Sequence, residues 1–240
     1  MFKKASLFLM ILVFGSSFYF AAMKPANSDP AKPHEFSAIE HQQDEFSDPK
    51  HFVDSISNEK TTLIFEAEGD LNGDGLKDWA GVFTKRKVDK EIFDGKTEVL
   101  FNQLFVLTQE KNGKYIIAER SKEGCVEASV CWVESLEVKN SSIYLNVFSK
   151  SDTHTSEDFQ FKYRDEKFQL IGYKTNKAYP AVGKNAPEKG IEIDRNLLTG
   201  RVVEKTQIGE KAAKIRTLRK KFSALYLRDF EFFYEDEIRQ

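Results

Sequence analysis

The chain has 240 residues, and its 36 basic and 38 acidic side chains leave a formal net charge of −2. This near balance gives no general attraction to nucleic acid or to an acidic membrane surface, so we predict no nucleic-acid partner. Hydrophobic residues make up 40% of the chain and include 21 Phe. A sizeable hydrophobic core is therefore expected, in one large domain or two small ones.

The N-terminus has the pattern of an export signal. The chain begins Met1-Phe2-Lys3-Lys4 and then runs apolar from Ala5 to Ala22. A basic start, a short apolar stretch and small residues at its end are typical of a secretory signal peptide. We assign residues 1–22 to the signal and predict a periplasmic or secreted protein without stable membrane insertion after cleavage. An uncleaved anchor is the alternative, because the apolar run is borderline in length for a membrane span.

The remaining sequence divides into a leader and a β-rich domain. Residues 23–55 are rich in proline and polar residues and are predicted to form a flexible leader. From residue 56 to residue 240 the apolar pattern has mostly period two, as in strands. The predicted fold class is all-β with minor helix: antiparallel hairpins in a sandwich or a curved sheet, within a single domain.

Several turn sequences mark the predicted hairpins. The first three lie between strand-like segments at Asn112-Gly113, Asn140-Ser141 and Asp165-Glu166, and a further turn is predicted at 196–200. The stretch 174–190 carries two prolines and two glycines, which predicts a long loop.

The C-terminal part is harder to assign. Residues 211–221 are rich in Lys and Arg, which indicates either the solvent-facing side of a strand or a contact for anionic lipid or glycan. Residues 222–237 are aromatic and acidic, and strand and helix compete there.

Residues 70–78, Asp-Leu-Asn-Gly-Asp-Gly-Leu-Lys-Asp, carry the most specific motif. Oxygen-bearing side chains stand at loop positions 1, 3, 5 and 9, and Gly75 at position 6 permits a sharp turn. Ca²⁺ prefers six to eight oxygen ligands arranged in this way. The predicted ligands are the side chains of Asp70, Asn72, Asp74 and Asp78 and the carbonyl of Leu76. A plain tight turn is the alternative, because Asp, Asn and Gly are common turn residues.

The motif is not an EF-hand. Position 12, where an EF-hand has a bidentate Glu, is Gly81, and the flanking segments 61–65 and 79–83 have strand patterns. A single loop of this kind between strands resembles the calcium loops of FG-GAP and VCBS-type repeats. The further order of hairpins, over roughly 60–200, is similar to β-rich bacterial exported proteins with one such loop. The resemblance implies a calcium ion held by Asp70, Asn72, Asp74, Leu76 and Asp78, and brings no activity with it.

The two cysteines, Cys125 and Cys131, are predicted to form a local disulfide, because an exported protein meets an oxidising compartment. Two buried, reduced thiols are the alternative. The spacing is not that of a zinc site.

No catalytic motif is present, and we name no catalytic residue. His34, His41, His51 and His154 are predicted to be solvated surface histidines, although His154 with Asp152 and Asp158 could form a site. The leading hypothesis is a non-enzymatic exported domain that binds an envelope protein or glycan, or supports the envelope. A hydrolase of an envelope polymer and an inhibitor or immunity-like protein are the alternatives.

Overall fold

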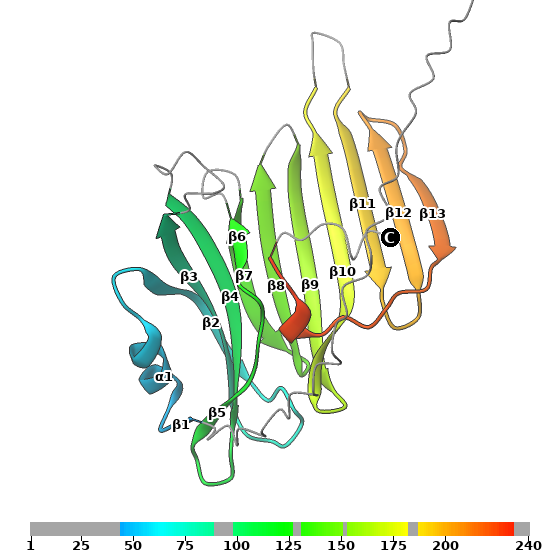
Figure 1. Ribbon diagram of the computed structural model, residues 1–240. Helices are drawn as coiled ribbons and strands as arrows, with labels where there is room; N and C mark the ends of the chain where they lie inside the picture. The colour runs from blue at the N-terminus through cyan, green and yellow to red at the C-terminus, as the bar shows by residue number, and fades with distance from the viewer. Residues whose placement is uncertain (1–43, 89–97, 127–130, 151–152, 182–186, 233–240) are drawn as a thin grey trace, which may run out of the picture. The chain divides into compact units, whose positions relative to one another are not determined.

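The computed structural model describes residues 44–88, 98–126, 131–150, 153–181 and 187–232 (Figure 1). All of them belong to one compact unit, Gln42–Gln240. The predicted signal peptide and most of the predicted leader lie outside the described residues.

The described residues form two antiparallel sheets, so the predicted all-β class with minor helix is confirmed. Sheet A has the order β1 (Glu45–Phe46), β5 (Tyr115–Arg120), β4 (Glu98–Gln109), β3 (Asp78–Val88) and β2 (Thr61–Gly69), and β6 (Gly124–Val126) also pairs with β4. Sheet B has the order β13 (Lys214–Arg219), β12 (Arg201–Ile208), β11 (Lys189–Asn196), β10 (Lys167–Tyr179), β9 (His154–Arg164), β8 (Ser142–Lys150) and β7 (Cys131–Lys139).

The predicted hairpin turns are confirmed. Asn140, Ser141, Asp165 and Glu166 all have φ between 49° and 61°. Consecutive residues with positive φ are the hallmark of the two-residue turns that match the twist of paired strands. The prediction of one long loop over 174–190 is wrong, because β10 continues to Tyr179 and β11 begins at Lys189. Pro180 follows the end of β10 and Pro187 precedes β11, while Gly190 lies within β11.

Sheet A lies between two hydrophobic layers. In β3, Ala80 and Val82 belong to the cluster shared with sheet B, whereas Trp79 and Phe83 belong to a second cluster on the opposite face. The same alternation in β4 places Leu104 and Phe105 in different clusters. Successive side chains of a strand point to opposite faces, so β3 and β4 are buried on both sides.

The helix α1 (Pro49–Ile56) covers the second face of sheet A. Asp48 caps its N-terminus by accepting a hydrogen bond from the His51 N–H, and Pro49 occupies the first turn. Phe46 and Phe52 are buried in the second cluster, with their ring centroids 5.1 Å apart. The ordered domain therefore begins well before residue 56, and the predicted end of the leader at residue 55 is wrong.

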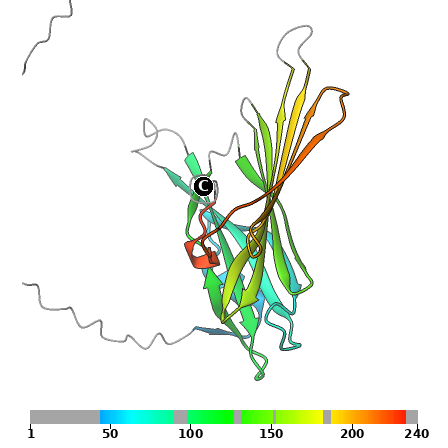
Figure 2. The same ribbon diagram turned by 90° about the vertical axis from the view of Figure 1, so that its right-hand side faces the viewer.

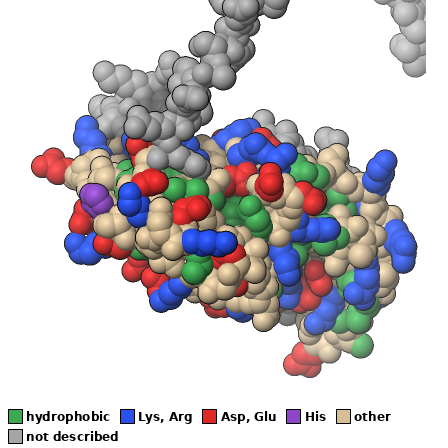
Figure 3. Space-filling view, turned by 90° about the horizontal axis from the view of Figure 1, so that it is seen from below, with side chains coloured by type: hydrophobic (Ala, Val, Ile, Leu, Met, Phe, Trp, Pro, Cys, Tyr) green, Lys and Arg blue, Asp and Glu red, His purple; other side chains and the backbone are tan. Residues whose placement is uncertain are grey.

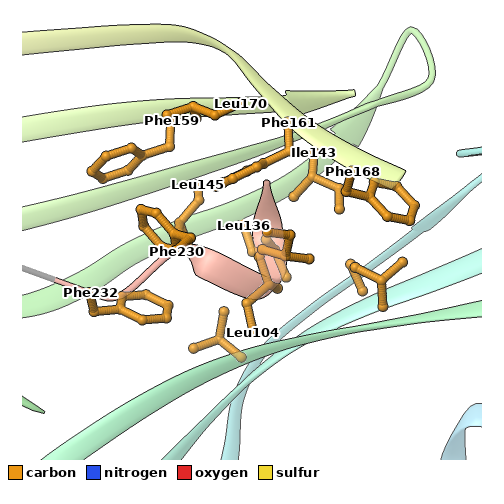
Figure 4. Packing of buried hydrophobic residues seen from close by; sticks show 14 of the residues in the cluster. Leu104, Leu136, Ile143, Leu145, Phe159, Phe161, Phe168, Leu170, Phe230 and Phe232 are labelled. Atoms are coloured by element: carbon orange, nitrogen blue, oxygen red, sulfur yellow. The ribbon is translucent and has the colours of Figure 1, made fainter. Parts of the chain in front are cut away.

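The C-terminal segment fills the space between the two sheets (Figure 2). The described part of this segment, which ends at residue 232, contains the short 3-10 helix η1 (Leu227–Asp229). The rest of this part is neither a named strand nor a helix. Leu227, Phe230 and Phe232 are almost fully buried. The rings of Phe159 and Phe161 lie 4.9 and 5.1 Å from that of Phe230 (Figure 4).

The surface seen in Figure 3 shows acidic and basic side chains interspersed, in keeping with the small net charge. The basic run forms β13, in which Lys214, Arg216 and Arg219 are exposed. Lys214–Arg219 of this run thus form an exposed strand, and a contact with anionic lipid or glycan stays the untested alternative. Among the described residues, no helix is long and apolar enough to span a membrane.

Candidate functional site

The predicted calcium loop joins β2 to β3 and is closed by its own hydrogen bonds. The carboxylate of Asp70 accepts from the N–H of Gly73 at 2.7 Å and of Gly75 at 3.0 Å. Asp74 accepts from the Leu76 N–H at 2.8 Å and from the Asn72 amide at 2.9 Å. Side chains that bond to backbone N–H groups a few residues along the chain stabilise tight turns.

Asp78 has a different role from the other loop residues. Its side chain is fully buried. One carboxylate oxygen accepts from the N–H of Leu71 at 2.8 Å and of Asn72 at 3.3 Å, and the other accepts from the N–H of Gln109 at 3.0 Å. Burial raises the pKa of Asp78, and these backbone bonds only partly oppose the rise. Asp78 therefore joins the loop to the end of β4.

This geometry fits a calcium ion only in part. Asp70, Asn72 and Asp74 are at least partly accessible, and an oxygen that accepts one hydrogen bond retains a second lone pair for a cation. Asp78 differs from Asp70, whose two oxygens also accept from backbone N–H groups, in that its side chain is fully buried. Its predicted role as a ligand is therefore the least supported of the set and stays a prediction. Within the described residues, no group of three or more His, Cys, Asp or Glu could hold a metal ion.

Gly81 is explained by the structure. A Cβ atom placed on Gly81 would lie 2.0 Å from the indole ring of Trp79. The position at which an EF-hand carries its closing Glu is therefore covered by a buried tryptophan, and no side chain fits there.

The cysteines stand at the ends of two strands. Cys125 lies in β6 of sheet A, and Cys131 begins β7 of sheet B. Their side chains lie outside what the structure describes, so the predicted disulfide stays a prediction. If they are bridged, the bond links the two sheets.

The two histidines that the structure describes, His51 and His154, belong to no cluster of three or more His, Cys, Asp or Glu among the described residues. His51 is exposed on α1, whereas His34 and His41 lie outside the described residues. His154 is not on a loop, as the sequence indicated, but is the first residue of β9. Asp158 is four residues along the same strand, about 13 Å away, and its carboxylate accepts from the Asn146 amide. Asp152 lies outside the described residues.

The outward face of sheet B carries a surface hollow of about 330 Å³, which we call the sheet B hollow. Its lining side chains come from five neighbouring strands, β8 to β12, and include Phe148, His154, Ser156, Asn176, Glu192 and Lys205. A second hollow of about 690 Å³ shares His154, Ala178, Gly190 and Gln207 with it, so the two are continuous.

The hollow exists because two paired positions lack large side chains. Ala178 of β10 lies opposite Gly190 of β11. A Cβ atom added to Gly190 would meet no atom within 4 Å, and Gly190 does not have positive φ. Neither packing nor backbone conformation requires glycine at this position. What the glycine provides is the open space above it.

An aromatic group forms one side of the hollow. Phe148 lines it, and the ring of Trp132, which is 40% exposed, lies 4.8 Å behind that of Phe148. The His154 ring lies 6.1 Å from Phe148 on the same face. Exposed aromatic rings beside a depression are typical of ligand sites, because the rings provide a large apolar contact area.

Some polar side chains that line the hollow have no protein partner, whereas Ser156 accepts a hydrogen bond from the Asn146 amide and Gln207 donates to the Gly209 carbonyl. Among the described residues, the side chains of Asn176, His154 and Lys205 make no hydrogen bond or ion pair. Glu192 is 3.4 Å from Lys174, and both side chains are 39% exposed. The hollow itself is lined by one carboxylate, Glu192, and two ammonium groups, Lys177 and Lys205, so its charge is close to balanced.

The opposite face of sheet B holds a buried polar cluster. Tyr173 donates a hydrogen bond to the carboxylate of Glu157, and the Arg195 guanidinium lies 4.7 Å from the Tyr173 ring centroid. Burial, followed by the charge of Glu157 and their hydrogen bond, raises the pKa of Tyr173. The cluster continues the core toward β11.

No protein-family model, curated protein or solved structure matches the chain.

Sequence reasoning missed the sheet B hollow, although a signal existed. Ala178 and Gly190 are small residues at facing positions of two strands, and Trp132 and Phe148 stand at outward positions of their strands. The pairing of β10 with β11 is what brings these residues together, and hairpin pairing across nine intervening residues was not predicted.

Proposed function

We propose that this domain is a non-catalytic binding domain, exported to the cell envelope or beyond, whose binding surface is the outward face of sheet B. The observation that supports the proposal is the sheet B hollow itself: an aromatic side, an open floor at Gly190, and polar groups without protein partners. Ligand sites typically combine apolar contact area with a few well-placed polar groups.

The rigidity of sheet B favours such a role. The inward faces of β7 to β10 are packed in a core of aromatic and aliphatic side chains from both sheets and the C-terminal segment (Figure 4). Strands that are fixed on one side hold the side chains of the other side in place, which lowers the entropic cost of binding.

We further propose that calcium binds at the loop 70–78 and has a structural role. The ligands would be Asp70, Asn72, Asp74 and the Leu76 carbonyl, while Asp78 positions the loop from inside the protein. Hydrogen bonds already fix the conformation of the loop, so the ion would add further stability to the connection between β2 and β3.

Binding to envelope material tests the main proposal. Purified protein is mixed with isolated insoluble envelope and sedimented, and the bound fraction is compared with that of Gly190→Val, which fills the hollow. We expect the wild type to sediment with the envelope and Gly190→Val to remain soluble. Thr217→Val is the control, since it also introduces a valine at an exposed strand position, in β13 and away from the hollow.

Equal sedimentation of both proteins, or none by either, would contradict the proposal. If the envelope polymer were instead cleaved, and Glu192→Gln abolished cleavage, the hydrolase alternative would replace it. A stoichiometric complex with another exported protein, insensitive to Gly190→Val, would favour the inhibitor alternative.

A further inference from the structure

We infer that the sheet B hollow binds a neutral carbohydrate chain, which lies across the strands of sheet B. The inference rests on the proposed binding function and adds the chemical class and direction of the ligand. Three features of the site support it: a cross-strand row, the chemistry of that row, and its charge.

The row is continuous across six strands. Pairing aligns Trp132 with Phe148, Phe148 with Ser156, and Ser156 with Asn176. It then aligns Asn176 with Glu192, and Glu192 with Lys205. Neighbouring strands are about 4.8 Å apart, so the row is about 24 Å long. This length suits an extended chain of several linked units and exceeds what a single small molecule would cover.

The row changes in character along its length. It begins with two aromatic rings, continues with a hydroxyl and an amide, and ends with a carboxylate and an ammonium group. A sugar ring has an apolar C–H face, which suits an aromatic ring, and a rim of hydroxyls that both donate and accept hydrogen bonds. The amide of Asn176 also donates and accepts, whereas Glu192 accepts and Lys205 donates.

A peptide strand is a poorer fit for this surface. The interior strands of sheet B are paired on both sides, so their backbone N–H and C=O groups are already used in the ladders. A peptide that crossed these strands could not join the sheet, and recognition has to come from side chains. Hydroxyl-rich chains are recognised in that way.

The charge of the site favours a neutral ligand. Glu192 and Lys205 are directly paired and of opposite sign, and Glu192 is also close to Lys174. In the continuous second hollow, Glu188 and Glu210 are accompanied by Lys189. Among the described residues, the two hollows together are lined by three lysines, Lys177, Lys189 and Lys205, and by three glutamates, so they offer no excess of positive charge to a phosphate-rich or uronic acid-rich polymer, which would require several basic side chains.

The chain contains its own reporter for this site. It has two tryptophans, of which Trp79 is 1% exposed and Trp132 is 40% exposed. Changes in emission, or in quenching by acrylamide, on addition of a soluble ligand therefore report mainly on Trp132, which begins the row.

The experiment titrates the full exported domain with neutral hexasaccharides of β-1,4-glucose, β-1,4-N-acetylglucosamine, α-1,4-glucose and β-1,4-mannose, with polygalacturonate as the acidic probe. We expect saturable binding of at least one neutral probe, unaffected by salt. Phe148→Ala should weaken it about tenfold, and Gly190→Val should abolish it. Tyr144→Ala removes an aromatic ring from the same strand and face as Phe148 but outside the lining of the hollow. This variant and Thr217→Val should leave the affinity unchanged. Melting curves confirm that each variant is folded.

Three results would overturn the inference. They are no binding of any neutral probe, binding of a neutral probe by Phe148→Ala and Gly190→Val as tight as that of the wild type, and salt-dependent binding of polygalacturonate alone. If the envelope binds in a hollow-dependent manner but no neutral probe does, the proposed binding function stands and the carbohydrate inference fails. If neither binds, both fail.

Discussion

Replacement of Asp78 by Ala should destabilise the domain more than any other change in the loop 70–78. The substitution leaves the N–H groups of Leu71, Asn72 and Gln109 without their acceptor. A buried donor without a partner costs about 1–3 kcal/mol. The bond from Leu71 is buried and the other two are partly buried, and relief of the buried charge offsets part of the loss. We therefore expect the free energy of unfolding to fall by about 3–5 kcal/mol.

Urea unfolding followed by the emission of buried Trp79 measures this loss, with EDTA present so that calcium does not contribute. Asp78→Asn, which keeps one acceptor oxygen, should lose less than Asp78→Ala. Asp74→Ala is the exposed control and should lose about 0.5–1.5 kcal/mol, because its two bonds are solvent-accessible. If Asp78→Ala cost no more than Asp74→Ala in EDTA, the buried carboxylate would not be what joins the loop to β4, and the reasoning would be refuted.

Three further predictions concern the metal, the cysteines and alkaline pH. Calcium at about 100 times its Kd should raise the free energy of unfolding by about 2.7 kcal/mol, and Asp74→Ala should remove that gain; identical melting curves with calcium and with EDTA would exclude the site. Cys125 and Cys131 should be bridged in protein recovered from the exported compartment, a gain of about 2–2.5 kcal/mol; thiol alkylation without reductant would show the opposite. The raised pKa of Tyr173 keeps its phenol protonated in the folded state, whereas the same phenol ionises at about pH 10 in the unfolded state. Its stabilising contribution is thus complete below that pH and is lost above it, by up to about 1.36 kcal/mol per pH unit. Tyr173→Phe should show a smaller loss of stability above pH 10, and equal slopes for both proteins would contradict the assignment.

The hairpins were predictable because their signals are local. Asn140-Ser141 and Asp165-Glu166 adopt positive φ, as their turn positions indicated, and the strands on either side follow the period-two pattern. The loop 70–78 was likewise located correctly between two strands. The continuation of β10 to Tyr179 was missed, because composition over 174–190 reflects where strands end but not whether two strands pair.

Contacts between residues far apart in the chain could not be predicted from the sequence. Asp78 has the spacing of a calcium ligand, but the N–H of Gln109, 31 residues away, occupies one of its oxygens. Gly81 occupies the position of the EF-hand Glu, and the presence of glycine there is explained by the Trp79 ring, which leaves no room for a side chain. The sheet B hollow requires five strands to be placed side by side before Phe148 and Gly190 can be seen to share a site.

A titration followed by NMR tests whether the outward face of sheet B is the binding surface. Backbone amide chemical shifts are mapped while the best-binding neutral hexasaccharide, or solubilised envelope polymer, is added. We expect shifts concentrated around Phe148, His154, Asn176, Gly190 and Lys205, with the loop 70–78 unaffected. Shifts confined to the loop 70–78 or to sheet A, or saturable binding that leaves β8 to β12 unchanged, would contradict this expectation.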